Sequence, residues 1–138
     1  MAALAWMLDT NTLSDLIKNP QGSVARRLAG VDPDRVCTSI VVACELRFGA
    51  QRKASPLLTS KVDDLLSALP VLALEAAVDH HYADIHLALE QAGTPIGSHD
   101  LFIAAHARSL GLVVVTHNLR KFQRVPGLQI EDWLLPVG

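Results

Sequence analysis

Short apolar runs alternate along the chain with longer segments in which apolar residues recur every three or four positions. The short runs predict buried strands, and the longer segments predict helices that keep one face in a core. The predicted strands cover residues 4–8, 36–38, 70–74, 112–115 and 128–130. The predicted helices cover residues 13–18, 21–28, 40–52, 56–68, 75–91, 100–110 and 119–122. Helices therefore separate most of the consecutive strands.

Residues that favour helix ends support these boundaries. Ser39 and Ser98 are predicted N-caps, since a serine hydroxyl accepts a hydrogen bond from the free N–H groups at a helix start. Gly93 and Gly111 follow predicted helices at the position where a left-handed backbone is common. The alternation predicts an α/β fold, a three-layer α/β/α sandwich around a central, mostly parallel sheet. The length suits one domain over residues 1–138.

The composition excludes several classes of protein. Half of the residues are hydrophobic and 19% are charged, so the chain should fold. No apolar run reaches the roughly 20 residues of a membrane span, and residues 1–8 lack the basic start of a signal peptide. We therefore expect a cytoplasmic protein that does not enter a membrane.

A net charge of −2 gives no general attraction for nucleic acid. A nucleic-acid partner would have to meet a local basic strip. Two strips are available: Arg47, Arg52 and Lys53, or Arg120, Lys121 and Arg124.

The cysteines and most of the histidines do not predict a metal or redox site. Cys37 and Cys44 are seven residues apart, which matches no zinc or redox spacing, so we interpret both as core residues. The histidines of the long helix, residues 75–91, form no i, i+4 pair, and His99 and His106 are seven residues apart. We therefore interpret all of these histidines as surface or interface residues. His117 is an exception, because it follows the strand over residues 112–115 and could touch a substrate phosphate.

Three carboxylates lie where the pattern otherwise predicts core. Asp9 ends the first strand, Glu45 shares a helix face with Val41 and Phe48, and Asp100 lies in the first turn of a helix. Each has an ordinary interpretation. Asp9 could bond the amides of the next helix, Glu45 could reach the edge of the core or pair with an arginine, and Asp100 could complement the helix dipole.

Taken together, the three acids indicate a metal site. In an open α/β sheet, functional sites form at the carboxyl ends of the parallel strands, which predicts that all three acids share one edge. Carboxylates gathered in this way raise one another's pKa values unless a cation neutralises them. Oxygen ligands suit Mg²⁺ or Mn²⁺, and such an ion can polarise a phosphate and activate a water. The leading hypothesis is metal-dependent phosphodiester hydrolysis.

A phospho-acceptor signalling domain is a rival of a different class, since it also combines an α/β sandwich with an acidic Mg²⁺ site. It requires an acidic pair after the first strand, an acceptor Asp after the third and a Lys after the fifth. Here Asp9 stands alone, Glu75 follows Leu74, and no lysine directly follows Val115.

Four segments, in order, carry a resemblance to a known family. They are residues 7–12 (MLDTNT), 38–50 (TSIVVACELRFGA), 93–107 (GTPIGSHDLFIAAHA) and 115–128 (VTHNLRKFQRVPGL). The chain resembles the PIN-domain ribonucleases, in particular the VapC toxins of bacterial toxin–antitoxin pairs. The ending Glu131-Asp132-Trp133 is similar to that branch, so the resemblance spans nearly the whole chain.

The resemblance implies roles for particular residues. It implies that Asp9, Glu45 and Asp100 bind the metal and that Asn118 takes the fourth position, where relatives carry Asp or Asn. By the same resemblance, the pocket is lined by Thr10, Ser39 and Thr116. Lys121 is a departure, because the family often has an acidic residue there; this argues against a fourth carboxylate and a tightly held second metal.

The resemblance also implies a biological activity. The expected protein is an Mg²⁺-dependent endoribonuclease toxin, with Mn²⁺ as a substitute. It would cut the anticodon stem-loop of a tRNA, with initiator tRNA as one candidate, and stop translation. A VapB antitoxin would silence it by laying an arginine-bearing tail across the acids. We expect a homodimer within a larger toxin–antitoxin complex, which reaches operator DNA only through the antitoxin. Cleavage of mRNA or rRNA, and a PIN-like module that binds without cutting, are the alternatives.

Overall fold

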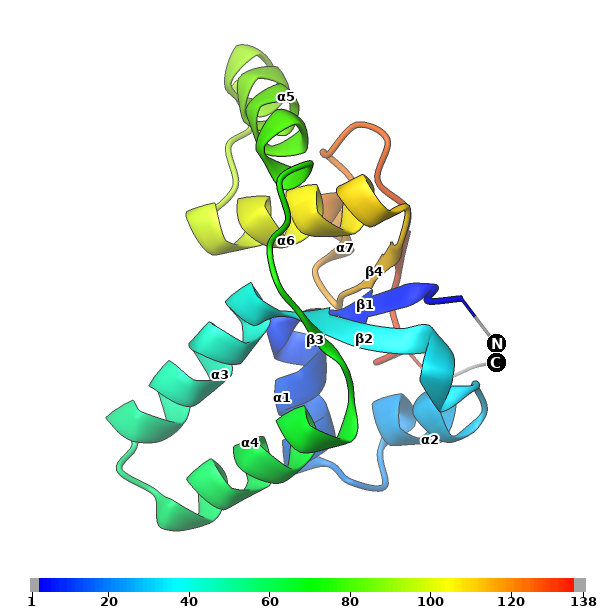
Figure 1. Cartoon of the computed structure of the whole chain (residues 1–138), viewed down its shortest axis with the longest axis vertical. Helices are drawn as coiled ribbons and strands as arrows, with labels where there is room; N and C mark the ends of the chain where they lie inside the picture. The colour runs from blue at the N-terminus through cyan, green and yellow to red at the C-terminus, as the bar shows by residue number, and fades with distance from the viewer. Residues whose placement is uncertain (1–2, 136–138) are drawn as a thin grey trace.

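A five-stranded parallel sheet forms the centre of the molecule in the computed structural model, which describes residues 3–135 (Figure 1). Its strands lie in the order β3-β2-β1-β4-β5, and every neighbouring pair is parallel. The strands are β1 (Trp6–Leu8), β2 (Val36–Ser39), β3 (Val71–Leu72), β4 (Val113–Val115) and β5 (Ile130–Glu131). The central strand is therefore the first one in the chain.

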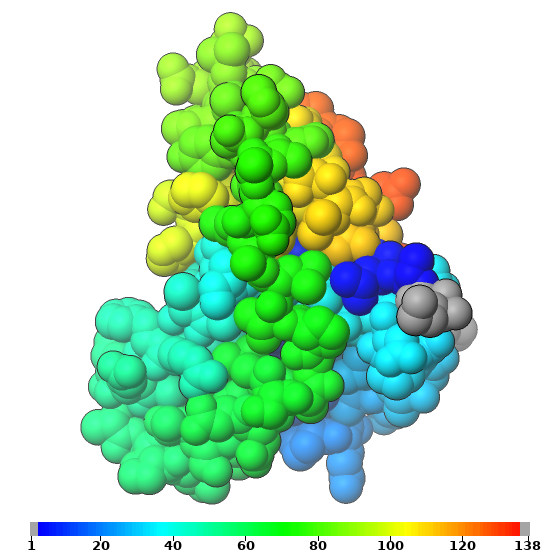
Figure 2. Space-filling view, in the orientation of Figure 1, coloured from blue at the N-terminus to red at the C-terminus, as the bar shows by residue number. Residues whose placement is uncertain are grey.

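Helices cover both faces of the sheet. On one side lie α1 (Thr10–Lys18), α2 (Ser23–Ala29), α3 (Ile40–Arg52) and α4 (Pro56–Ala68). On the other side lie α5 (Val78–Gln91), α6 (Ser98–Leu110) and the short α7 (Leu119–Phe122). A 3-10 helix, η1 (Pro33–Arg35), leads into β2. Figure 2 shows the α3–α4 and α5–α6 pairs at opposite ends of the long axis.

Alternation along the strands explains the two cores. Side chains of successive strand residues point to opposite faces of a sheet. Met7 and Val114 pack in the core beneath α5, α6 and α7, whereas their neighbours Leu8 and Val115 pack in the core beneath α1 to α4. Both cores consist mainly of aliphatic side chains, with Trp133 and Phe122 as fully buried aromatic residues.

The α/β class and the parallel sheet predicted from the sequence are confirmed, and each predicted strand and helix is present. Several boundaries differ. Four of the strands are shorter than the apolar runs, whereas β2 extends one residue further, to Ser39. The long helix begins at Val78 because residues 75–77 form a turn. Ser98 is not an N-cap: α6 begins at Ser98 itself, and Gly97 is its cap residue. The left-handed glycines are confirmed at Gly93 and Gly111, with φ of 70° and 68°.

The two cysteines have different environments. Cys37 is buried in β2, as predicted, and burial raises the pKa of its thiol to about 12. Cys44 is exposed, so its interpretation as a core residue is wrong. The helical turn places the neighbouring Ala43 in the core and turns Cys44 outward. Within the described residues, no helix combines the length and apolar character that a membrane crossing requires.

Candidate active site

The carboxyl ends of the three central strands meet at one edge of the sheet. Leu8, the last residue of β1, lies in register with Thr38 of β2 and Val115 of β4. The chain leaves β1 at Asp9 and leaves β4 at Thr116, directly beyond that register. Strand order reverses around β1, and such a switch point is where open α/β sheets form their ligand sites. Asp9 is therefore located at the position that the topology favours for chemistry.

Asp9 is a buried carboxylate with a side chain that caps α1. Its residue is 3% exposed, and its Oδ1 accepts a hydrogen bond of 3.0 Å from the backbone N–H of Thr12. Burial raises the pKa of Asp9, hydrogen bonds from Thr116 and Thr12 oppose the shift, and the negative charge of Asp100 raises the pKa further. The ionised form of Asp9 is therefore disfavoured in the folded protein.

Glu45 approaches the same edge from α3. Its Oε1 accepts a hydrogen bond of 2.6 Å from the Thr10 hydroxyl, and its Oε2 lies 3.2 Å from Nδ1 of His99. Thr10 directly follows Asp9, and His99 directly precedes Asp100. Through these two contacts Glu45 meets the chain neighbours of both other acids. The fold therefore brings the three predicted carboxylates to one edge of the sheet.

Asp100 has a cationic partner. In the first turn of α6, its Oδ2 accepts a hydrogen bond of 2.8 Å from Nζ of Lys121, which lies on α7. The side chains are 27% and 34% exposed, respectively. The ordinary interpretation of Asp100 as an acid in the first helical turn is compatible with this arrangement. Its proximity to Asp9, however, is a tertiary feature that a helix dipole does not explain.

The residues fit a hard divalent cation in chemical type. Within residues 3–135, Asp9 has no ion pair although it is buried and lies near Asp100. Carboxylate oxygens are the ligands that Mg²⁺ and Mn²⁺ prefer. As they stand, no three His, Cys, Asp or Glu side chains of the described residues are gathered closely enough to hold an ion. Binding would require the three carboxylates to move closer together, and Lys121 contacts only Oδ2 of Asp100.

The predicted pocket residues have different environments. Thr10 lines the groove surface beside Glu45. Thr116 is buried, bonds Asp9 and accepts a hydrogen bond of 3.0 Å from the backbone N–H of Asn118. Ser39 does not line an open pocket, because it is fully buried. Its hydroxyl caps α3 by accepting from Val41 N and lies 2.8 Å from Nδ1 of the buried His106.

Asn118 and His117 are each engaged with other partners. The Oδ1 of Asn118 caps α7 by accepting a hydrogen bond of 3.2 Å from the backbone N–H of Lys121. Nδ1 of His117 lies 3.0 Å from Oδ2 of Asp132, so its ring is turned toward the C-terminal segment. Asn118 thus fixes the helix that carries Lys121.

Sequence reasoning missed the contact of His99. His99 is exposed, as interpreted, but its Nδ1 also lies 3.2 Å from Oε2 of Glu45. The same interpretation is wrong for His106, which is buried at 1% exposed. For the contact of His99, its position directly before Asp100 was the available signal. It was insufficient, because the contact depends on how α6 packs against α3.

Two grooves flank Glu45. The first, of about 700 Å³, is mainly apolar and lies between α3 and α6, with Phe48 and Phe102 in its walls. The second, of about 200 Å³, runs between α1, α3 and α4 and carries the cations Lys18, Arg52 and Lys53. Thr10 and Glu45 belong to both grooves. Glu45 is therefore accessible from an apolar side and from a basic side.

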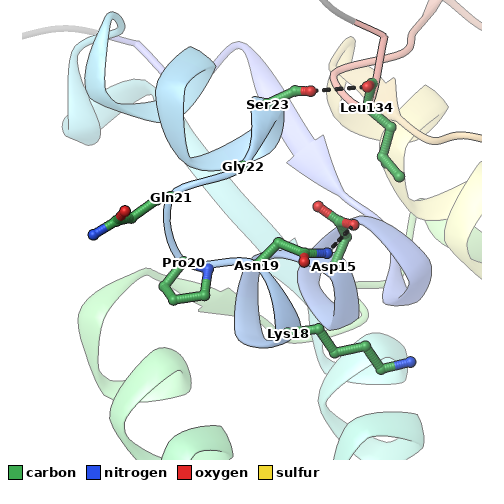
Figure 3. Close-up of a pocket in the computed structure, with 8 residues that line it drawn as sticks. All are labelled: Asp15, Lys18, Asn19, Pro20, Gln21, Gly22, Ser23 and Leu134. Atoms are coloured by element: carbon green, nitrogen blue, oxygen red, sulfur yellow. Dashed lines mark hydrogen bonds between the residues drawn. The ribbon is translucent and has the colours of Figure 1, made fainter.

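A third hollow, of about 530 Å³, lies between α1, α2 and the C-terminal segment (Figure 3). Ser23 donates a hydrogen bond of 2.8 Å to the carbonyl of Leu134 across it, and Asn19 donates one of 2.9 Å to Asp15. None of the predicted site residues lines this hollow. The candidate site is therefore the acidic edge.

The parallel α/β fold with acids at the carboxyl ends of its strands belongs to a family that sequence comparison names. Residues 6–128 match the family model described as PIN domain, and the chain belongs to that family. This membership excludes the phospho-acceptor domain considered above.

Full-length relatives place the chain in the VapC branch. It is 41% identical to the tRNA(fMet)-specific endonuclease VapC of Salmonella typhimurium, across 94% of this chain and 98% of that protein. It is 36% identical to Ribonuclease VapC2 of Haemophilus influenzae, across 95% and 99%. Among solved structures, DNA-bound VapBC from Salmonella typhimurium superimposes with a TM-score of 0.89 at 41% identity, across 94% and 98%. VapBC2 from Rickettsia felis, bound to a promoter DNA fragment, gives 0.88 at 32% identity, across 94% and 99%.

Proposed function

We propose that this protein is a metal-dependent endoribonuclease toxin that is neutralised by a VapB-type antitoxin. One observation carries the proposal: Asp9 is a carboxylate that is 3% exposed, has a pKa raised by burial and lies near a second acid. Such an arrangement weakens the fold unless a ligand uses it. Because Asp9 lies at the switch point of a PIN domain, we propose that this ligand is a divalent metal ion.

Asp9, Glu45 and Asp100 would hold Mg²⁺, or Mn²⁺ in its place. When bound, the ion supplies Lewis-acid stabilisation of the phosphate and lowers the pKa of a water. The chain's own residues supply position. Thr12 and Thr116 hold the Asp9 carboxylate, and Thr10 orients Glu45. Positioning and electrostatic stabilisation are the main contributions a protein makes to phosphodiester cleavage.

The reaction that we propose is hydrolysis by direct attack of water on phosphorus. The bond from phosphorus to the 3′-oxygen breaks as the new bond to the water oxygen forms, and the departing oxygen takes up a proton. The products are one end with a 5′-phosphate and one with a 3′-hydroxyl. Attack by a ribose 2′-hydroxyl would instead leave a cyclic 2′,3′-phosphate, so the chemistry of the ends tests the mechanism.

The proposed substrate is RNA, and a tRNA in particular. The Salmonella typhimurium relative is named a tRNA(fMet)-specific endonuclease at 41% identity, and this name is the reason to propose initiator tRNA. Its anticodon stem-loop is proposed because an RNA loop presents splayed bases and accessible phosphates. The basic groove beside Glu45 carries Lys18, Arg52 and Lys53, which suit the phosphates of a splayed RNA loop. The same acids would cut mRNA or rRNA in a differently shaped groove, so these remain the alternatives.

The apolar groove between α3 and α6 suits a partner protein. Phe48, in its wall, is 62% exposed, which is unusual for a large apolar side chain unless something covers it. Structures of the relatives contain VapB as well as VapC. We propose that a VapB-type antitoxin occupies this groove and that an arginine in it pairs with the acids. The toxin would act in the cytoplasm as a homodimer, reaching DNA only through the antitoxin.

The test is cleavage of defined RNAs by the purified protein. We expect a tRNA transcript to be cut in Mg²⁺ and left intact in EDTA, with 5′-phosphate ends that sequencing locates in the anticodon loop. Asp9→Asn should abolish cleavage and growth arrest together. Asp64→Asn, which removes an exposed carboxylate of α4, is the matched control and should cut normally.

The outcome separates the alternatives. Growth arrest that survives in the Asp9→Asn variant would identify a binding module that acts without cutting. Cleavage confined to mRNA or rRNA would retain the enzyme class and overturn the substrate.

A further inference from the structure

Lys121 is the one lysine that forms an ion pair with a site acid within the described residues. Its Nζ donates a hydrogen bond of 2.8 Å to Oδ2 of Asp100. The other two acids have partners of a different kind: Glu45 meets Thr10 and His99, and Asp9 meets uncharged donors. The ammonium group is therefore a component of the acidic edge.

The local structure holds Lys121 at this position. It lies on α7, a four-residue helix whose start is capped by Asn118 through the backbone N–H of Lys121 itself. The next residue, Phe122, is 1% exposed and anchors the helix in the core beneath α6. The Lys121 backbone is thus fixed from two sides. Pairing with Asp100 therefore orders only the lysine side chain and not the backbone that carries it.

The charges of the site balance with one metal ion. Asp9, Glu45 and Asp100 carry three negative charges when ionised. One divalent ion and the Lys121 ammonium carry three positive charges, so together they neutralise the site. A second divalent ion would leave an excess of positive charge in a partly buried pocket, which is unfavourable.

We propose that Lys121 takes the place of a second metal ion, so that the site binds a single divalent cation. This inference rests on the proposed function, because it assumes that the acids bind metal at all. The ammonium would supply from the protein the fixed positive charge that a two-metal site obtains from its second ion. Lysine suits this task, because it is a compact charge with three donors. Lys121 acts as a positioning residue through Asp100.

Calorimetric titration with Mn²⁺ tests the inference by counting ions. Wild-type protein should bind one ion. Lys121→Glu, which supplies a fourth carboxylate, should bind two. Lys121→Met removes a competing cation and should bind its ion roughly three- to tenfold more tightly. Arg120→Met, an exposed cation on the same short helix, is the matched control and should match wild type in both number and affinity.

Kinetics at saturating Mg²⁺ provide an independent readout. Lys121→Met should lower kcat without a matching change in KM for RNA, and raising the Mg²⁺ concentration should not restore it. Lys121→Arg, which keeps the charge, should recover most of the loss. A residue that served only folding would show the opposite pattern: a lowered melting temperature with unchanged kcat in the folded fraction.

The inference and the proposed function fail in different ways. Two ions on wild-type protein that cleaves RNA, or one ion on Lys121→Glu, would overturn the inference and leave the ribonuclease in place. Wild-type protein that neither binds Mn²⁺ nor cleaves RNA would overturn both. Should Lys121→Glu not fold, as judged by circular dichroism, the affinity of Lys121→Met decides: an affinity equal to that of wild type overturns the inference.

Discussion

Glu131 and Asp9 are two carboxylates near the same edge of the sheet, and they differ in whether the protein compensates their charge. Glu131, in β5, lies in register with Val115 of β4. Its two oxygens accept hydrogen bonds of 3.2 and 3.1 Å from the indole N–H groups of Trp6 and Trp133, and Arg27 lies 3.5 Å away. The backbone N–H of Asp9 donates a hydrogen bond to the carbonyl of Val115. Its carboxylate forms no salt bridge with any residue from 3 to 135.

The difference is the one expected between a structural acid and the metal ligand proposed for Asp9. The protein supplies Glu131 with donors and a cation, so its charge is compensated within the fold. Asp9 is buried beside another acid, and its ionised form is disfavoured. A fold selected only for stability would replace such a group, because an uncompensated buried charge costs free energy. A carboxylate left in this condition therefore indicates a ligand from outside the chain, and the comparison can be tested from both sides.

The largest effect should come from Asp9→Asn. An asparagine still caps α1, because Asn and Asp are equally good N-caps, but it removes the negative charge. We expect the single-turnover rate of RNA cleavage to fall by about a thousandfold or more. A variant that cleaves at the wild-type rate would contradict the assignment of Asp9 to the site.

The same variant should be more stable than wild type in metal-free buffer at neutral pH. The pKa of Asp9 is raised in the folded state, so the cost of ionisation appears as the pH rises above 3.8 and is complete above the folded-state pKa. Removing the charge removes that cost. Between pH 3 and pH 8, the melting temperature of Asp9→Asn should rise further above that of wild type as the pH increases. A difference that is constant with pH would contradict the explanation.

Glu131→Ala should show the reverse behaviour. Loss of this carboxylate leaves the indole of the fully buried Trp133 without its acceptor, and the indole of Trp6 as well. We expect the free energy of unfolding to fall by about 2–3 kcal/mol, with cleavage retained well below the lowered melting temperature. Chemical denaturation and RNA cleavage at one temperature measure both quantities. Lost cleavage without lost stability would place Glu131 in the site.

Magnesium should stabilise the two variants differently. A ligand that binds only the folded state at a hundred times its Kd stabilises it by about 2.7 kcal/mol. We expect this increment for wild type and for Glu131→Ala, and a much smaller one for Asp9→Asn. Differential scanning fluorimetry with and without Mg²⁺ gives all three. Equal increments would show that the ion binds elsewhere on the protein.

His106 should produce the smallest effect. It is 1% exposed beside Ser39, and burial lowers its pKa below 6.5. The unfolded chain therefore takes up a proton more readily, and stability is lost as the pH falls from 6.5 toward the folded-state pKa. The slope for one proton is at most about 1.4 kcal/mol per pH unit. Melting curves of wild type and His106→Gln between pH 5 and pH 8 should differ in this slope, and parallel curves would exclude the histidine as its source.

Much of the fold and the acidic edge could be predicted because both depend on topology. Alternation of strands and helices implies a parallel sheet, and a parallel sheet brings its carboxyl ends together wherever the helices lie. That argument alone predicts that Asp9, Glu45 and Asp100 are neighbours. It contains no information about the angles at which helices pack, so it could not predict the contacts His99–Glu45 and Lys121–Asp100 in detail.

The remaining differences also have physical causes. Ser39 lies at a strand end, as a pocket residue should, but the buried ring of His106 covers it. Cysteine is a residue type that is often buried, yet Cys44 lies one position past the buried Ala43 on α3 and faces outward. For Cys44 the outcome depends on a rotation of one residue's spacing about the axis of α3. An apolar pattern does not define a helix orientation so finely.

Pairing of the first strand with a strand near the end of the chain governs when activity can arise during synthesis. β1 is finished once it pairs with β4, where Trp6 meets Val113. Asp9 therefore leaves the ribosome long before the residues that complete its surroundings, including Asp100 and Lys121. Prematurely terminated chains that lack this last part have neither the partner strand nor the full set of acids. Incomplete chains therefore cannot assemble the site proposed above.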